Sequence, residues 1–204
     1  ALGVRVALPI PLIADCIIRV GMGFLYAPSF HSAMNYAAPV RKELGFRTLF
    51  NLLGPLTNPA KAPAQLVGVF DDELTEKFAA VLKNLGCCHA LIVHGSDGLD
   101  EITITGTSKI TELKHNEFKT YSLDPRSLGI ELVSPSELIS TGITDTVAIT
   151  HDILQAQKGP RRDVVLLNSA AGLIAAGKAD DFRRGIEIAA DAIDSGRAYS
   201  VLER

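Results

Sequence analysis

The feature that most constrains the fold of this chain is a strand–helix–strand pattern in its first half. Gln65–Phe70 and Ala90–His94 are short apolar runs typical of buried strands. Between them, Asp71–Leu85 carries apolar side chains at helical spacing, with Asp71 as the predicted N-cap and Gly86 as the stop. Together the three pieces have about thirty residues, the size of a βαβ unit. We therefore predict that the two strands run parallel.

The rest of the chain continues to mix strands and helices. Phe24–Ala27 and Glu101–Thr105 are further strand candidates, and Lys109–Leu113 with Phe118–Leu123 predict a hairpin. The sequence contains no linker, repeat or low-complexity segment. We therefore predict the α/β class, with a largely parallel sheet flanked by helices, in a single domain over residues 1–204.

The last third of the sequence has mainly helical patterns. Ser134–Glu137 has the Ser, Pro and Glu spacing of a helix start. Longer helices are predicted over Asp145–Gln157, Arg161–Ala176 and Asp181–Ser195. The second of these has an apolar stripe along one side, so we expect these helices to cover the sheet.

Composition and charge exclude several classes of protein. Of the 204 residues 47% are hydrophobic, and the net charge is −3, which is typical neither of a disordered chain nor of a nucleic-acid binder. The longest apolar runs, such as Val6–Ile13, are interrupted by proline and are shorter than the ~20 residues of a membrane span. Cys16, Cys87 and Cys88 lack the spacing of a disulfide framework or a zinc site. We expect a cytoplasmic protein with reduced thiols, no nucleic-acid partner and no membrane partner.

An acidic, glycine-containing loop follows the strand predicted over Ala90–His94. It places Asp97, Asp100 and Glu101 just past the carboxyl end of that strand, where open α/β sheets gather ligands. Adjacent carboxylates suit a hard cation such as Mg²⁺, which keeps waters and bridges to substrate phosphates. A solvated acidic turn is the alternative interpretation, because Asp and Glu are common in exposed turns.

A second candidate site lies in the segment Phe30–Leu44. At helical spacing His31, Met34 and Arg41 fall on one side, although Pro39 kinks or restarts the helix between them. A guanidinium beside apolar and imidazole groups could hold a planar aromatic carboxylate. A surface arginine in a charged run is the alternative.

Other segments carry no reactive group. Thr48–Pro59 predicts a rigid loop with two Gly/Pro turns and contains no strong acid, base or nucleophile. Walker A, H-E-x-x-H and G-x-S-x-G patterns are missing from the sequence.

Several motifs taken together resemble the anthranilate phosphoribosyltransferase family. The resemblance is carried by Gly23–Pro28, His31-x-x-Met34, Ala38–Gly45, Arg47–Pro59 and Gly98–Glu101. The block Arg47–Pro59 is the most specific of them. The match continues to the end of the chain, through Leu167–Ala171 and Ala192–Gly196.

The resemblance implies a Mg²⁺-dependent pentosyl transferase of tryptophan biosynthesis. Its small-molecule substrates are anthranilate and phosphoribosyl pyrophosphate (PRPP), and its products are N-(5-phosphoribosyl)anthranilate and pyrophosphate. Asp100 and Glu101 match the acidic pair that binds Mg²⁺. Arg41 matches the arginine that contacts anthranilate, and His31, Met34 and Pro28 match positions along the anthranilate channel. Enzymes of the family are usually homodimers.

The family's glycine-rich phosphoribosyl-binding loop, its Lys-His-Gly-Asn segment and its N-terminal helices have no counterpart in this sequence. We therefore expect this chain to be the larger part of an α/β domain and to be nearly inactive alone, with Arg41 and the pair Asp100–Glu101 facing one cleft in the parent enzyme. Two alternatives stay open. One is an enzyme like pyrimidine nucleoside phosphorylase, and the other is a truncated module that only binds a ligand or partner.

Overall fold

The structure is a computed structural model that describes residues 2–30, 36, 39, 43–45, 48 and 50–204. The chain divides into two compact units, and the larger one comprises residues 62–199. The smaller unit comprises residues 1–61 and 200–204. The single domain predicted over residues 1–204 stays a prediction.

The smaller unit is helical in its described part. Its helices before residue 62 are α1 (Ile10–Arg19), α2 (Ala27–Phe30) and α4 (Phe50–Leu56). Helix α1 follows Pro9 and has a second proline in its first turn, where the missing N–H groups cost nothing. Its apolar side chains are largely exposed, with Ile13 as its buried residue.

Two predictions in the smaller unit are wrong. Phe24–Ala27 is not a strand: the segment has no regular structure up to Tyr26, and Ala27 begins α2. The rings of Phe24 and Tyr26 stack on each other, with centroids 6.5 Å apart, and both remain more than a third exposed. Thr48–Pro59 is not a loop throughout, because Phe50–Leu56 forms helix α4. Just before this helix, the Thr48 amide donates to Asn51 Oδ1 over 2.9 Å.

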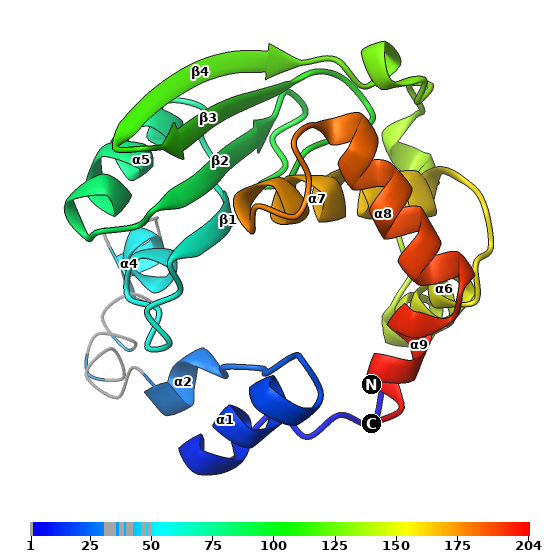
Figure 1. The fold of residues 1–204 in the computed structure, drawn as a ribbon, viewed down its shortest axis with the longest axis horizontal. Helices are drawn as coiled ribbons and strands as arrows, with labels where there is room; N and C mark the ends of the chain where they lie inside the picture. Colours follow the sequence, from blue (N-terminus) through cyan, green and yellow to red (C-terminus); the bar gives the residue numbers. More distant parts are fainter. Residues whose placement is uncertain (1, 31–35, 37–38, 40–42, 46–47, 49) are drawn as a thin grey trace. The chain divides into compact units, whose positions relative to one another are not determined.

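The larger unit contains a sheet and the remaining helices (Figure 1). Its elements in chain order are β1 (Ala64–Gly68), α5 (Leu74–Asn84), β2 (His89–Gly95), β3 (Ser108–Lys114), β4 (Glu117–Leu123), the 3₁₀ helices η1 (Pro125–Leu128) and η2 (Pro135–Glu137), α6 (Ile143–Leu154), α7 (Pro160–Ala175) and α8 (Phe182–Asp194). Helix α9 (Arg197–Leu202) begins here and ends in the smaller unit.

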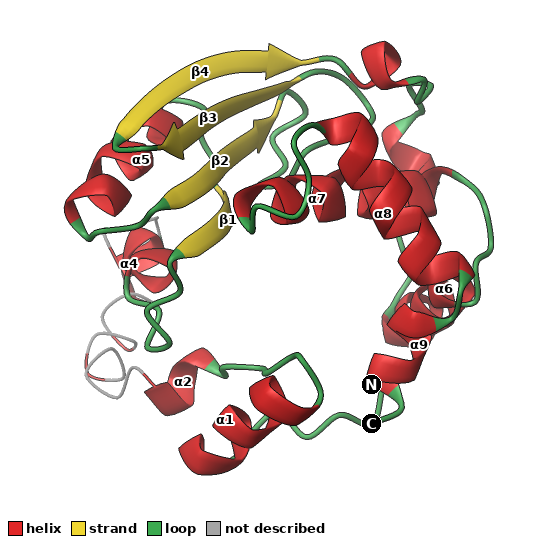
Figure 2. Ribbon diagram, in the orientation of Figure 1, coloured by secondary structure: helices red, strands yellow, loops and turns green. Residues whose placement is uncertain are grey.

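Among the described residues the strands form one four-stranded sheet in the order β1-β2-β3-β4 (Figure 2). The α/β class is confirmed, and so is the βαβ unit, because β1 and β2 pair in parallel across α5. The expectation of a largely parallel sheet is wrong for this part of the chain, since β2–β3 and β3–β4 are antiparallel. The physical reason is the connection between β2 and β3, a loop without the helix that a parallel crossover needs.

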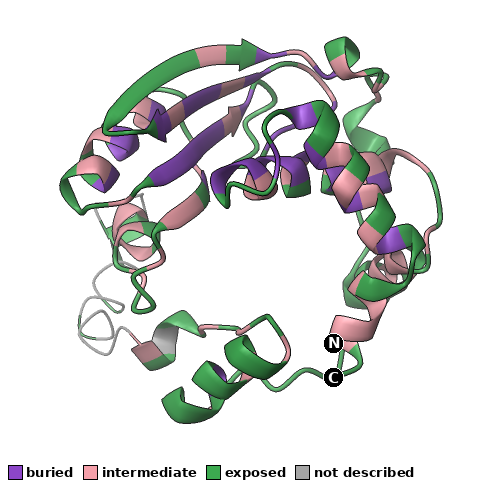
Figure 3. Cartoon of the chain, viewed as in Figure 1, coloured by how far each residue is buried: buried purple, intermediate pink, exposed green. Residues whose placement is uncertain are grey.

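Helices cover both faces of the sheet (Figure 1). Helix α5 packs against β2, β3 and β4, whereas α7 packs against β1 and β2. The main core lies under α7, where Leu91, Val93 and Ile110 meet Leu167 and other apolar residues of that helix. Figure 3 shows buried residues concentrated on β2, β3 and α7. The apolar stripe predicted for the helix over Arg161–Ala176 is confirmed, because α7 packs its apolar side chains into this core.

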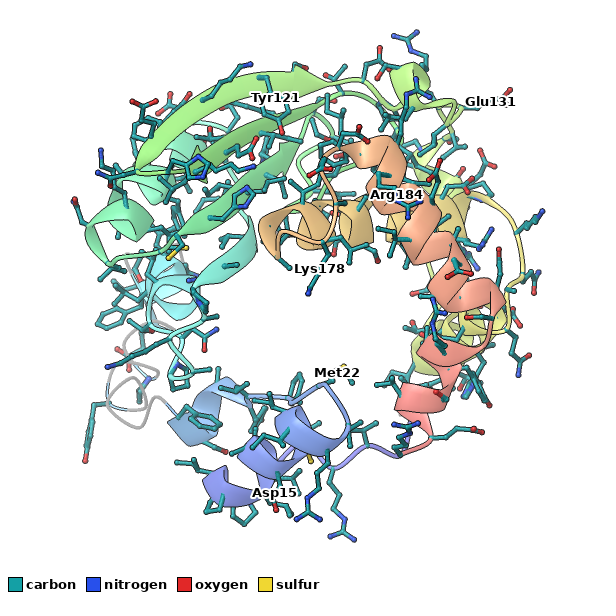
Figure 4. The ribbon with its side chains drawn as sticks, viewed as in Figure 1. Asp15, Met22, Tyr121, Glu131, Lys178 and Arg184 are labelled. Carbon is teal, nitrogen blue, oxygen red and sulfur yellow. The ribbon has the colours of Figure 1, made fainter. Side chains whose placement is uncertain are left out.

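The strands also carry polar side chains that are buried (His89) or half-buried (Glu112 and Tyr121). His89 Nε2 lies 2.8 Å from Glu112 Oε1, and Tyr121 lies on β4 (Figure 4). Burial, assisted by the charge of Glu112, raises the pKa of Tyr121 to about 12. The phenol is therefore neutral throughout the physiological range.

Two further predictions need correction in the larger unit. Glu101–Thr105 is not a strand, because the amides of Ile102 and Thr103 donate to the side chains of Asn168 and Ser108 rather than to a neighbouring strand. Ser134–Glu137 begins only the short helix η2, although the predicted capping box is present. Within the described part of the chain, no helix combines the length and the apolar character needed to cross a bilayer.

Candidate metal centre

A cavity of about 470 Å³ opens at the carboxyl ends of β1 and β2. Its lining residues come from β1, β2, the loop after β2 and the middle of α7: Leu66, Gly68, Val93, Asp100, Glu101, Val165, Asn168 and Ser169. Two hydrogen bonds hold the strand ends together at this edge: the Val69 amide donates to Val93 O over 3.0 Å, and the His94 side chain donates through Nδ1 to Val69 O over 2.8 Å. This is the edge of an α/β sheet at which ligands gather.

The loop after β2 is folded by its own backbone. The amide of Gly95 donates to Leu99 O over 2.8 Å, and the amide of Gly98 donates to Gly95 O over 2.9 Å. Gly98 has φ = 90°, a conformation that favours glycine. The amide of Ser96 closes the loop by donating to Thr107 O over 2.9 Å. The turn therefore presents the residues that follow Gly98 in a fixed position.

Asp97 is the hydrogen-bonding centre of this loop. Its Oδ2 accepts from the hydroxyls of Thr103 and Thr105 over 2.6 and 2.5 Å, and its Oδ1 accepts from the Leu99 amide over 3.2 Å. Burial alone would raise the pKa of Asp97, but these donors outweigh it and the pKa lies below its ordinary value. The sequence grouped Asp97 with Asp100 and Glu101 as possible ligands. The structure instead commits the Asp97 carboxylate to the loop.

The carboxylates of Asp100 and Glu101 have a different environment. Both residues line the cavity, and neither has a hydrogen bond or an ion pair to another residue that the structure describes. Burial, and then the neighbouring charge of Asp100, raise the pKa of Glu101 above its ordinary value. Two adjacent carboxylates without donors repel each other, and a cation between them would relieve that repulsion.

The position of Asp100 depends on Gly68. A Cβ atom at Gly68 would lie 1.6 Å from the carbonyl oxygen of Asp100 and 2.6 Å from its carbonyl carbon. Both contacts are to backbone, which cannot rotate away. Only a glycine at the end of β1 lets the acidic turn approach the strand this closely.

The carboxylates of Asp100 and Glu101 fit a hard cation whose remaining ligands are waters and substrate oxygens. The described residues hold no group of three or more His, Cys, Asp or Glu side chains arranged for a metal. A pair of carboxylates is too few for a closed structural site but matches Mg²⁺, which takes one or two carboxylates, several waters and substrate phosphates.

The predicted anthranilate contacts are in the smaller unit. His31, Met34 and Arg41 lie outside the described residues, and Pro28 belongs to α2. These assignments and the shared cleft with Asp100 and Glu101 therefore stay predictions.

Sequence reasoning missed the roles of Gly68 and Asn168. Gly68 could have been noticed as a glycine inside a strand pattern, which often marks a close backbone approach. Asn168 interrupts the apolar stripe of α7 with a polar side chain. Both residues contact the acidic turn, Gly68 through Asp100 and Asn168 through Ile102.

The model of a glycosyl transferase family, described as its a/b domain, matches residues 1–199. The chain belongs to this family. The cavity at the sheet edge is thus a feature of a glycosyl transferase α/β domain, and the α/β class predicted from the sequence is the class of that family.

Two curated relatives of this glycosyl transferase chain are both anthranilate phosphoribosyltransferases. An anthranilate phosphoribosyltransferase of Moorella thermoacetica is 52% identical over 203 residues, and one of Symbiobacterium thermophilum is 51% identical over 205 residues. Each alignment covers 100% of this chain and 60% of the relative. The resemblance predicted from the motifs is therefore confirmed. The chain spans about 60% of the length of these relatives.

Solved structures of anthranilate phosphoribosyltransferases also have a fold similar to that of this chain. Anthranilate phosphoribosyltransferase from Thermus thermophilus has a TM-score of 0.92 and 40% identity, over 100% of this chain and 60% of that one. The Saccharomyces cerevisiae enzyme in complex with PRPP and Mg has a TM-score of 0.89 and 29% identity, over 99% of this chain and 58% of that one.

Proposed function

We propose that this chain supplies the Mg²⁺ site of an enzyme that transfers the 5-phosphoribosyl group from PRPP to anthranilate. The observation that carries the proposal is the pair Asp100 and Glu101, which line the cavity at the sheet edge without a donor among the described residues. The chain's family and the names of its relatives point to the same reaction. The yeast structure with PRPP and Mg supports the choice of metal.

In the proposed reaction the amine of anthranilate attacks the ribose C1 carbon, the bond from C1 to the pyrophosphate oxygen breaks, and the amine loses a proton. Mg²⁺ would supply charge neutralisation at the departing pyrophosphate. Asp100 and Glu101 would hold the ion, and the ionised form of Glu101 is the form that can do so. The chain's part is then positioning and electrostatics, and no protein nucleophile takes part.

The anthranilate contacts form a second part of the proposal. Arg41 would bind the carboxylate of anthranilate through paired hydrogen bonds, while His31, Met34 and Pro28 would line the channel for its ring. In the parent enzyme, Arg41→Ala should raise the KM for anthranilate and leave the Mg²⁺ requirement unchanged. Unchanged kinetics with respect to anthranilate would remove Arg41 from the site.

We further propose that the parent enzyme is a cytoplasmic homodimer and that residues 1–204 alone are nearly inactive. The reason for low activity is the missing counterpart of the glycine-rich loop that binds the phosphoribosyl diphosphate. The measurement is formation of phosphoribosylanthranilate at saturating PRPP and Mg²⁺. Turnover by residues 1–204 close to that of a full-length relative would contradict this part of the proposal.

The decisive experiment uses the parent enzyme with Asp100→Asn and Glu101→Gln. We expect each variant to lose at least about 100-fold in kcat/KM for PRPP, because each removes a ligand charge from the metal. Raising Mg²⁺ should recover part of the loss. Glu131→Gln is the matched control, since Glu131 is an exposed carboxylate on a loop of the larger unit, away from the acidic turn (Figure 4).

Three results would count against the proposal. Wild-type activity in both acidic variants would remove the metal assignment. Phosphorolysis of a pyrimidine nucleoside in place of anthranilate transfer would favour the nucleoside phosphorylase alternative. Binding of PRPP with no transfer by the parent would favour the binding module.

A further inference from the structure

We propose that Asn168 is a positioning residue that holds the acidic pair in place through the backbone of Ile102. This inference deepens the proposed function and rests on it, because the pair is taken to be the metal site. Asn168 belongs to α7, and the pair belongs to the loop after β2, so the contact joins two elements that are far apart in sequence.

The contact is a two-way clamp on a single residue. Asn168 Oδ1 accepts from the Ile102 amide over 2.9 Å, and Asn168 Nδ2 donates to Ile102 O over 2.8 Å. The side-chain amide thus satisfies both polar backbone groups of Ile102, as an adjacent strand would do. Nδ2 also donates to Val164 O over 3.0 Å, which ties the clamp to the preceding turn of α7.

Burial makes this clamp difficult to replace. Ile102 is 0% exposed, and its side chain belongs to the core under α7. Water has little access to its amide and carbonyl, so loss of Asn168 would leave two polar groups without partners or force the segment to move. Glu101 is one peptide bond away, and such a movement would displace its carboxylate directly.

The same geometry distinguishes a positioning role from ligand binding. Both hydrogens on Nδ2 are already donated to backbone carbonyls. Asn168 therefore has no free donor for a phosphate, although it lines the cavity. Its effect on a metal must pass through the backbone of Ile102 to Glu101.

The test uses electron paramagnetic resonance to measure how Mn²⁺, a paramagnetic substitute for Mg²⁺, binds to the parent enzyme with and without PRPP. We expect Asn168→Ala to weaken Mn²⁺ binding about 10-fold or more, as loss of an outer-shell partner typically does. Asn168→Asp keeps an acceptor for the Ile102 amide and loses both donors. It serves as the second variant if Asn168→Ala does not fold.

The matched control is Leu166→Ala on the same helix. Leu166 is buried against Ala189 and Ile193 of α8 and belongs to a different core cluster from Ile102. This substitution should lower the unfolding temperature at least as much as Asn168→Ala, yet change Mn²⁺ binding less than about 3-fold. If the two variants lost Mn²⁺ affinity in proportion to their loss of unfolding temperature, the positioning role would be overturned.

A second readout does not depend on metal. In the wild-type chain the Ile102 amide should exchange slowly with solvent, because it is buried and donates to Asn168 Oδ1. Asn168→Ala should speed exchange at Ile102 at least 10-fold, whereas Leu166→Ala should leave it unchanged. Unchanged exchange at Ile102 in a folded Asn168→Ala chain would overturn the inference.

Failure of the proposed function gives a different pattern. If Asp100→Asn and Glu101→Gln bind Mn²⁺ as the wild type does, the metal assignment fails, while the amide-exchange data still decide the role of Asn168. If these two variants lose Mn²⁺ and Asn168→Ala retains it, the metal site stands and the positioning role is overturned.

Discussion

The two ends of the acidic turn carry the same chemical group in opposite environments. At one end, the Asp97 carboxylate accepts from two threonine hydroxyls and one backbone amide. At the other end, Asp100 and Glu101 face a cavity and accept from none of the residues the structure describes. The pKa of Asp97 is lowered and that of Glu101 is raised, although the two residues are close neighbours in the sequence.

The difference shows that the Asp97 carboxylate stabilises the loop, whereas the carboxylates of Asp100 and Glu101 are available to a ligand. Donors directed at Asp97 stabilise its charge and fix the loop around it. Asp100 and Glu101 instead keep their lone pairs available, at an electrostatic cost that a cation would remove. Composition could not distinguish the three, because all belong to one acidic segment.

The largest expected effect comes from Gly68→Ala, which pushes the cavity end of the turn away from β1. Its Cβ would meet the backbone of Asp100, so we expect a loss of about 2 kcal/mol or more in the free energy of unfolding. Mn²⁺ binding should be lost even where the chain remains folded. Thermal unfolding and Mn²⁺ titration measure the two effects.

Asp97→Asn should have a smaller effect, of about 1 kcal/mol, since the residue is exposed and its hydrogen bonds compete with water. Because the folded pKa of Asp97 is lowered, its contribution is present above the ordinary value of 3.8 and is lost as pH falls through the folded value. The stability difference between variant and wild type should therefore shrink in acid. Denaturant unfolding between pH 7 and pH 3 measures it, and a difference that does not depend on pH would contradict the assignment.

Glu101→Gln should have the opposite sign. The folded pKa of Glu101 is raised, so ionisation costs the folded state more than the unfolded state, and the wild type loses stability as pH rises through 4.5 and then the folded value. The variant should be more stable than wild type at pH 7, by less than about 1 kcal/mol because solvent screens the exposed carboxylate, and equal to it below pH 4. Excess Mg²⁺ with PRPP should reverse the order by stabilising the wild type alone. A destabilised variant at pH 7 without metal would show that Glu101 has a structural partner after all.

The smallest effect is expected for Gly106→Ala, the control for Gly68→Ala. A Cβ at Gly106 would lie 2.4 Å from Ser96 Oγ, the end of a side chain that can rotate, rather than against backbone. Stability should change by less than about 0.5 kcal/mol, as for surface substitutions. If the two glycine variants lost the same stability, the close approach of Asp100 to β1 would not explain the effect of Gly68→Ala.

Much of the larger unit could be predicted from the sequence because its signals are local. The apolar runs and the helical spacing between them predicted β1, α5 and β2, and the hairpin of β3 and β4 followed from two strand patterns with a short turn. One error fell on a segment whose hydrogen-bond partner is distant in the sequence. Glu101–Thr105 has the composition of a strand, yet Ile102 pairs with a side chain sixty-six residues later.

The sequence by itself determined the α/β class, the family resemblance and the acidic pair Asp100–Glu101, since each is carried by consecutive residues. Only the tertiary structure decided which carboxylate is bound by donors and which is left for a ligand, and that Gly68 and Asn168 hold the turn. Hydrogen bonds and steric exclusion act over a few ångströms in space, whatever the separation along the chain. A residue's role in this site is therefore set by neighbours that its local sequence does not contain.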